Sequence, residues 1–139
     1  MAKLELALEA TLDHEGFYGN DSSDTGRETI WGIARYFNPK WVGWPIVDSL
    51  KNEDGFPACM KDNSELLEAR DEFYTKAFWT PIKGDEIINQ EVANDLFDKA
   101  VNMGIYQAMV LCQRSLDIPE TGKMNSATLN VLNINNSFV

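Results

Sequence analysis

The chain has 139 residues, 44% of them hydrophobic, and a formal net charge of −10 at pH 7. This length fits one domain with one core, and the hydrophobic content is too high for a disordered chain. The negative charge argues against nucleic acid and anionic membranes as partners, because proteins bind both through patches of Lys and Arg.

The N-terminus lacks the continuous hydrophobic segment that a signal peptide needs. Leu4, Leu6 and Leu8 alternate with other residues, among them Glu5. No stretch approaches the roughly 18 apolar residues of a membrane-spanning helix. We therefore expect a protein that is made in the cytoplasm without a signal peptide and does not insert into membranes. We also expect a monomer.

Metal binding is not predicted. The two cysteines, Cys59 and Cys112, have no ligand spacing between them, and the only histidine is His14. A zinc site would need further Cys or His ligands. The spacing leaves open whether the two cysteines pair.

The first helix is predicted over residues 3–15. Leu4, Leu8 and Leu12 repeat at helical spacing, and Gly16 is a plausible end. Turn-forming residues over 20–26, followed by β-prone residues, then predict a small irregular hairpin within 17–34.

Residues 35–61 are the least regular part of the chain, with a short helix predicted over 45–50. This segment carries Trp41 and Trp44. Long ordered loops with aromatic residues are often functional, so we expect at least one of the two tryptophans to line a ligand site. The alternative is that both anchor the loop to the core.

Periodicity predicts four further helices, over residues 63–78, 91–103, 105–116 and about 126–133. Asp62 with Glu65 forms a capping-box pattern before the first of them. Leu96, Phe97 and Ala100 give the second a wide apolar face, so we expect them at the centre of the domain. The chain is thus predicted to be mainly α-helical with one small β element.

The transition from helix to hairpin could support glycosidic bond cleavage, which needs a proton donor and a second group that handles the cationic sugar or activates water. Glu15 ends the first helix near Phe17 and Trp31. Apolar surroundings raise the pKa of a carboxyl group, which keeps its proton. Asp24 lies in a polar turn where it would stay charged, and Thr29 could orient a water molecule.

The same residues also have structural interpretations. A glutamate at a helix end is usually a surface residue, and Asp24 could be only a turn residue. Glu28 is expected to be solvated and His14 to be exposed. Asn102 could simply form a hydrogen bond within its own helix end.

Two stretches near the start resemble the signature of glycoside hydrolase family 108. Residues 15–20 resemble its E-G-G-Y-x-N pattern and residues 24–33 its D-P-G-G-E-T-x-x-G-I pattern, without gaps. Residues 73–79 are similar to the family's Y-x-x-x-Y-W helix and residues 96–104 to its L-F-D-x-A-V-N-x-G. Residues 111–129 resemble the peptidoglycan-binding segment that closes family members.

The resemblance implies a lysozyme-like α+β fold in a single domain, residues 1–139, with a small β-hairpin beside a glycan cleft. The catalytic motif region would span residues 12–33, and a helical peptidoglycan-binding-like segment about 91–133. The implied enzyme is a lysozyme-type N-acetylmuramidase, a bacteriolytic hydrolase that needs no cofactor. It would cleave the β-1,4 bond between N-acetylmuramic acid and N-acetylglucosamine in the peptidoglycan glycan strand. The missing signal peptide favours a phage endolysin that reaches the cell wall from the host cytoplasm.

By this resemblance Glu15 is the general acid, Asp24 stabilises positive charge or helps to bind water, and Thr29 positions that water. The expected substrate-binding residues are Tyr18, Asn20, Arg27, Trp31, Trp41, Trp44 and Asn102. Arg27 departs from the family pattern, which has Gly there. A positive φ at this position would strain Arg27. Arg27 could instead reach a lactyl or peptide carboxylate of the substrate.

Two other functions remain open from the sequence. A lytic transglycosylase would act on the same bond with one acid/base group and no attacking water. A non-catalytic glycan-binding or secretion-assisting module would keep the cleft without the chemistry. Such a module has no need for a proton donor, which argues against it.

Overall fold

The computed structural model describes residues 1–13, 16–20 and 27–134. Contacts group the chain into two compact units. We call Leu12–Phe73 the sheet unit, and Met1–Thr11 with Tyr74–Val139 the helical unit. The expectation of one domain stays a prediction. No helix in the described residues is long and apolar enough to cross a membrane.

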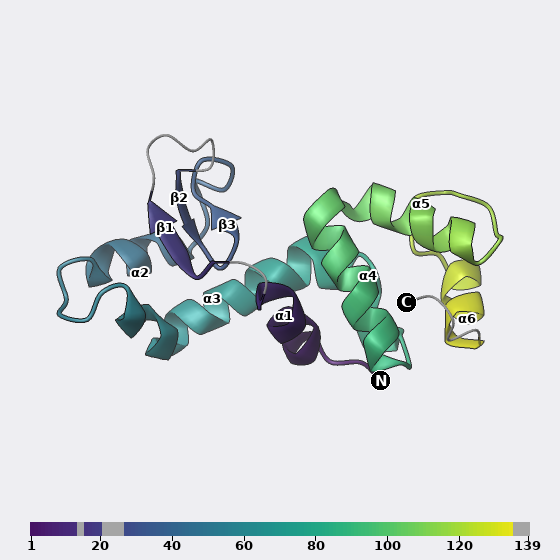
Figure 1. Cartoon of the computed structure of the whole chain (residues 1–139), viewed down its shortest axis with the longest axis horizontal. Helices are drawn as coiled ribbons and strands as arrows, with labels where there is room; N and C mark the ends of the chain where they lie inside the picture. Colours follow the sequence, from purple (N-terminus) through teal and green to yellow (C-terminus); the bar gives the residue numbers. More distant parts are fainter. Residues whose placement is uncertain (14–15, 21–26, 135–139) are drawn as a thin grey trace. The chain divides into compact units, whose positions relative to one another are not determined.

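The sheet unit contains a three-stranded antiparallel sheet in the order β1-β2-β3 (Figure 1). Its strands are β1 (Tyr18–Asn20), β2 (Glu28–Ile30) and β3 (Ile33–Ala34). The predicted hairpin is therefore present, and the structure adds a third strand. Residues 31 and 32 connect β2 to β3.

This two-residue turn has positive φ at both positions, 49° at Trp31 and 80° at Gly32. Two positive φ values are typical of the type I′ turn, whose twist matches that of the flanking strands. An aromatic residue rarely adopts this conformation. Trp31 is held there by its backbone N–H, which donates a 2.7 Å hydrogen bond to the carbonyl oxygen of Phe17.

The irregular segment contains α2 (Gly43–Leu50), which confirms the predicted short helix and begins two residues earlier. A 3₁₀ turn, η1 (Ala58–Asp62), precedes α3 (Ser64–Tyr74). The predicted capping box at Asp62 is wrong, because Asp62 already belongs to η1. Asn63 caps α3 instead, with its Oδ1 accepting a 3.0 Å hydrogen bond from the Leu66 N–H.

The predicted helix over 63–78 continues past α3 as a π-helical turn, η2 (Thr75–Trp79). A 3₁₀ turn, η3 (Gly84–Glu86), follows it. The helical unit then centres on α4 (Gln90–Met103), whose N-terminus is capped by Asn89. Phe97 on α4 is fully buried and packs on Trp79, with ring centroids 5.8 Å apart. Leu96 and Ala100 are also fully buried, which confirms the predicted core face.

The remaining helices of this unit are α1 (Leu4–Leu12, shared with the sheet unit at its last residue), α5 (Ile105–Ser115) and α6 (Ser126–Ile134). Gly104, with φ 90°, separates α4 from α5 as predicted. Asn125 caps α6 by accepting a 2.8 Å hydrogen bond from the Thr128 N–H. The fully buried Gln113 on α5 donates 3.0 Å hydrogen bonds to the Thr128 hydroxyl and the Lys123 carbonyl oxygen.

Candidate active site

Thr29 is a predicted catalytic residue within the described structure, whereas Glu15 and Asp24 lie outside the described residues. Thr29 is the central residue of β2. It pairs with Gly19 of β1 and with Ala34 of β3. We call these three residues the Thr29 row. All three are half-buried, so the row is partly open to solvent.

The two faces of β2 differ. Successive side chains of a strand point to opposite faces, and here Glu28 and Ile30 are buried while Thr29 is half-buried. Thr29 therefore faces away from the packed side of the sheet. A methyl group added to Gly19 would lie 3.7 Å from Thr29 Oγ1, an ordinary contact. The Thr29 hydroxyl thus has small neighbours on both adjoining strands.

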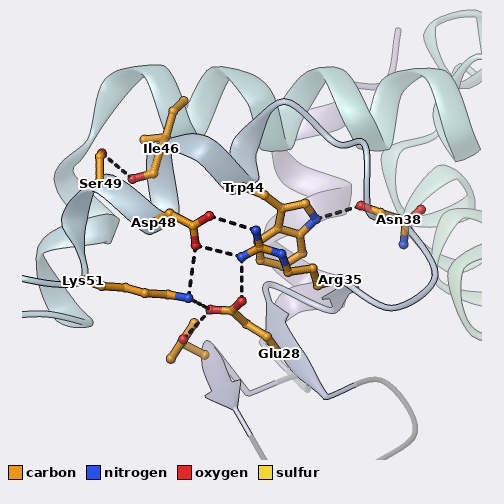
Figure 2. Close-up of polar contacts among 9 residues, drawn as sticks. Glu28, Arg35, Asn38, Trp44, Ile46, Asp48, Ser49 and Lys51 are labelled. Carbon is orange, nitrogen blue, oxygen red and sulfur yellow. Dashed lines mark hydrogen bonds and ion pairs between the residues drawn. The ribbon is translucent and has the colours of Figure 1, made fainter.

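The packed face carries an ion-pair cluster around Glu28, which the sequence analysis expected to be solvated. That expectation is wrong, because Glu28 is only 6% exposed. Its carboxylate accepts a 2.6 Å hydrogen bond from the Tyr18 hydroxyl. It also forms ion pairs with Arg35 Nη1 and Lys51 Nζ, each at 2.9 Å. Arg35 also forms a bidentate pair with Asp48, both bonds at 2.8 Å (Figure 2). Two cations and two carboxylates close this cluster, which we call the Glu28 cluster.

The Glu28 cluster sets the protonation of its members. Burial alone would raise the pKa of Glu28, but contacts from Lys51, Tyr18 and Arg35 outweigh it and hold the pKa below its usual value. Burial, together with the hydrogen bond to Glu28 and the charge of Glu28, raises the pKa of Tyr18 to about 12. Glu28 is therefore ionised at neutral pH and has no proton to donate to a leaving group.

Tyr18 and Asn20 were both expected to bind substrate. They pair with Ile30 and Glu28 respectively, so strand alternation puts them on the face of the Glu28 cluster and not on that of Thr29. The Tyr18 hydroxyl is engaged by Glu28, and its ring packs edge-on against Phe56 at 5.2 Å. Asn20 is exposed.

The tryptophans of the sheet unit are largely interior. Trp31 is 8% exposed and lies between the Phe17 ring, at 5.3 Å, and the Arg70 guanidinium, at 4.9 Å. Trp44 is 1% exposed and donates its indole N–H to the carbonyl oxygen of Asn38 at 2.7 Å. These contacts favour the structural interpretation of Trp44, in which it anchors the loop to the core.

Trp41 is half-buried. Its indole N–H donates a 3.1 Å hydrogen bond to the carbonyl oxygen of Ala69, and its ring packs edge-on against Trp44 at 5.1 Å. Asn102 belongs to the helical unit, where its Nδ2 donates to the Asp98 carbonyl oxygen at 2.9 Å. This is the hydrogen bond within the helix end that the structural interpretation of Asn102 predicted. The substrate-binding roles of Trp41 and Asn102 stay predictions.

Arg27 has φ 56°, so the strain that the sequence analysis attached to this position is present. Its guanidinium carbon lies 5.6 Å from the centre of the Tyr36 ring.

Both thiols, Cys59 and Cys112, are free, and burial raises the pKa of the Cys112 thiol to about 11. The described residues contain no cluster of three or more His, Cys, Asp or Glu that could hold a metal ion.

The sequence model of the Glycosyl hydrolase 108 family matches residues 8–104, well over half of the chain. The chain belongs to the glycosyl hydrolase 108 family. A comparison with curated proteins found no match. Among solved structures, the chain is similar to "Structure of Brucella abortus SagA", with a TM-score of 0.58 and 19% sequence identity. That similarity covers 93% of this chain and 67% of the SagA chain, and it supports the predicted lysozyme-like α+β fold.

As a member of the glycosyl hydrolase 108 family, the chain is a glycoside hydrolase whose substrate is a glycan. The matched segment includes Glu15, Asp24 and Thr29. It ends at Gly104, so α5 and α6 lie beyond it. The peptidoglycan-binding role expected for the C-terminal segment stays a prediction.

The buried, ion-paired state of Glu28 was not predicted from the sequence, although Glu28 lies within the matched segment of this glycosyl hydrolase 108 member. One signal was available: Glu28 and Ile30 share a strand face, and Arg35 follows seven residues later with the opposite charge. The partners Lys51 and Asp48 belong to another element, and no local pattern links them to Glu28.

Proposed function

We propose that this glycoside hydrolase is a lysozyme-type N-acetylmuramidase that cleaves the β-1,4 bond between N-acetylmuramic acid and N-acetylglucosamine in peptidoglycan. The observation that carries the proposal is the family match over residues 8–104, which contains the acidic motif with Glu15 and Asp24. A glycosidase needs a proton donor and a second group at the anomeric centre, and this motif supplies both residue types.

In the proposed mechanism, Glu15 protonates the leaving glycosidic oxygen. Asp24, ionised, stabilises positive charge on the sugar or helps to hold the attacking water, and the Thr29 hydroxyl orients that water. The partly open Thr29 row, with small residues on both sides of Thr29, supports a role that requires contact with water. Glu28 does not compete for the role of acid, because its carboxylate is ionised and held by three partners.

We further propose that the enzyme acts on the cell wall as an endolysin, and that the segment after Gly104 helps it to bind peptidoglycan. The sacculus is the one place where its substrate occurs as a continuous polymer. The net charge of −10 suits a protein that stays dissolved until it meets the wall.

The test is digestion of purified peptidoglycan by the parent protein and by Glu15→Gln. This change keeps the shape of the side chain but removes the proton, so lytic activity should fall by at least ~10²-fold with the melting temperature unchanged. Glu9→Gln, at an exposed position on α1, is the matched control and should keep full activity.

Mass spectrometry of the products completes the test. Hydrolysis leaves N-acetylmuramic acid as a reducing end, whereas a transglycosylase leaves a 1,6-anhydro sugar. Near-normal lysis by folded Glu15→Gln would reject the assignment of the acid, and no cleavage by the parent protein would reject the proposed substrate.

A further inference from the structure

Two large aromatic side chains lie exposed on the surface of the sheet unit. Tyr36 is 57% exposed and Phe37 is 65% exposed, directly after β3. Their rings contact each other edge to face, with centroids 5.0 Å apart and planes at 83°. Exposed aromatic rings of this kind offer apolar faces on which the C–H groups of a sugar ring can pack.

Arg27 adds a positive charge to this surface. Its guanidinium lies over the Tyr36 ring at 5.6 Å, and its side chain is exposed. The strand pairing brings these two residues together. The Arg35 N–H donates a 2.9 Å hydrogen bond to the Glu28 carbonyl oxygen, and Arg27 and Tyr36 are the next residues on the two chain segments. Arg27 is two residues from Thr29, on the order of 7 Å along the chain.

Arg27 differs from the other arginines of the chain in what it contacts. Arg35 pairs with Glu28 and Asp48, Arg70 with Asp71, and Arg114 with Glu120. Within the described ranges no carboxylate forms an ion pair with Arg27. Among the described residues, Arg27 therefore contacts an aromatic ring, whereas the other arginines contact carboxylates.

The backbone conformation of Arg27 also supports a binding role. Its φ of 56° lies in the left-handed region, which favours glycine and strains other side chains. Strained residues persist where the surroundings hold them, and they concentrate at binding and catalytic sites. The positive φ of Arg27 is thus consistent with a binding role for its guanidinium.

We infer that Arg27, Tyr36 and Phe37 form a subsite for a carboxylate-bearing part of the glycan substrate. The aromatic rings would carry a sugar ring, and the planar guanidinium would bind the carboxylate through two parallel hydrogen bonds. This inference rests on the proposed function, since it names the part of peptidoglycan that the enzyme recognises. The carboxylate belongs either to the stem peptide or to the lactyl group, which is free only where the peptide is absent.

Calorimetric titration with three soluble ligands tests the subsite, with every protein carrying Glu15→Gln to suppress turnover. The ligands are glycan strands with stem peptides, the same strands after amidase removal of the peptides, and N-acetylglucosamine oligomers, which lack any carboxylate. Arg27-containing protein should bind at least one carboxylate-bearing ligand about tenfold more tightly than the oligomers. The tighter of the first two ligands identifies the source of the carboxylate.

Arg27→Gly should abolish this preference while keeping a melting temperature at or above that of its parent, because glycine suits the backbone. Tyr36→Ala and Phe37→Ala should weaken binding of all three ligands by severalfold. Lys83→Gly is the matched control: Lys83 is also a cation at positive φ, 53°, but it belongs to the helical unit and should leave every affinity unchanged.

A parent without the preference, or an Arg27→Gly protein that retains it, would overturn the subsite. The proposed function fails separately, because it requires cleavage of peptidoglycan by the protein with Glu15 intact. Retained preference for the acidic glycan without cleavage would support the subsite and reject the hydrolase assignment. If the protein with Glu15 intact cleaves peptidoglycan but Arg27→Gly leaves the affinities unchanged, the hydrolase assignment stands and the subsite is wrong.

Discussion

The Tyr18 hydroxyl donates a 2.6 Å hydrogen bond to Glu28 Oε2, which links β1 to β2 on the sheet face opposite Thr29. Arg35, directly after β3, and Lys51, directly after α2, bind the same carboxylate. One buried anion therefore joins four segments of the sheet unit. The cluster stabilises the strand that presents Thr29 without occupying the face of Thr29.

Removing the charge of Glu28 should destabilise the protein more than removing that of Asp48. Glu28 is 6% exposed, and its loss leaves Tyr18 and two cations without their common partner. We expect Glu28→Gln to lower the free energy of unfolding by about 1–3 kcal/mol. Asp48→Asn, whose side chain is 45% exposed, should cost about 1 kcal/mol or less. Urea denaturation measures both, and equal losses would contradict a central role for Glu28.

The Glu28 cluster should make stability fall on the acid side. The pKa of Glu28 lies below the usual glutamate value of 4.5, so the folded state binds fewer protons than the unfolded state in that range. Its contribution is present above about pH 4.5 and is lost as pH falls through the lowered pKa. Melting temperatures between pH 6 and pH 3 should therefore decline less steeply in Glu28→Gln than in the parent. Parallel curves for the two proteins would show that other carboxylates cause the loss of stability at low pH.

Tyr18 should ionise late in an alkaline titration. Its pKa of about 12 arises from burial and from Glu28, whose hydrogen bond and negative charge both oppose the phenolate. A raised pKa means that this contribution to stability is present below pH 10 and is lost as pH rises through the folded-state value. Absorbance at 295 nm should show a phase near pH 12 that Tyr18→Phe removes. Glu28→Gln should move this phase to lower pH, and a phase that stays in place would mean that Glu28 does not act on Tyr18.

The helical unit should depend on Phe97. This side chain is fully buried and its ring lies near those of Tyr74, at 6.0 Å, and Trp79, at 5.8 Å. Phe97→Ala removes buried surface and leaves a cavity, which costs roughly 3–5 kcal/mol. Met103→Ala on the same helix removes a side chain that is 42% exposed and should cost about 0.5 kcal/mol or less. Chemical denaturation gives both values, and similar midpoints for the two variants would place the core elsewhere.

The helices were predictable because their signals are local. The apolar spacing of Leu96, Phe97 and Ala100 repeats with the period of a helix, and burial of one face follows from that period. The prediction of helix caps was less reliable. Asp62 and Asn63 both suit a helix start, and only the 3₁₀ turn that absorbs Asp62 leaves Asn63 as the cap.

Motif spacing alone selected Glu15, Asp24 and Thr29, since the family pattern depends on residue order and not on contacts. Tertiary structure decided the environment of Glu28. A carboxylate in a three-residue strand is solvated by default, and burying it requires cations near enough to offset the lost hydration. Arg35 and Lys51 supply that charge only because the chain after β3 and the end of α2 meet at one point, a convergence that no local pattern encodes.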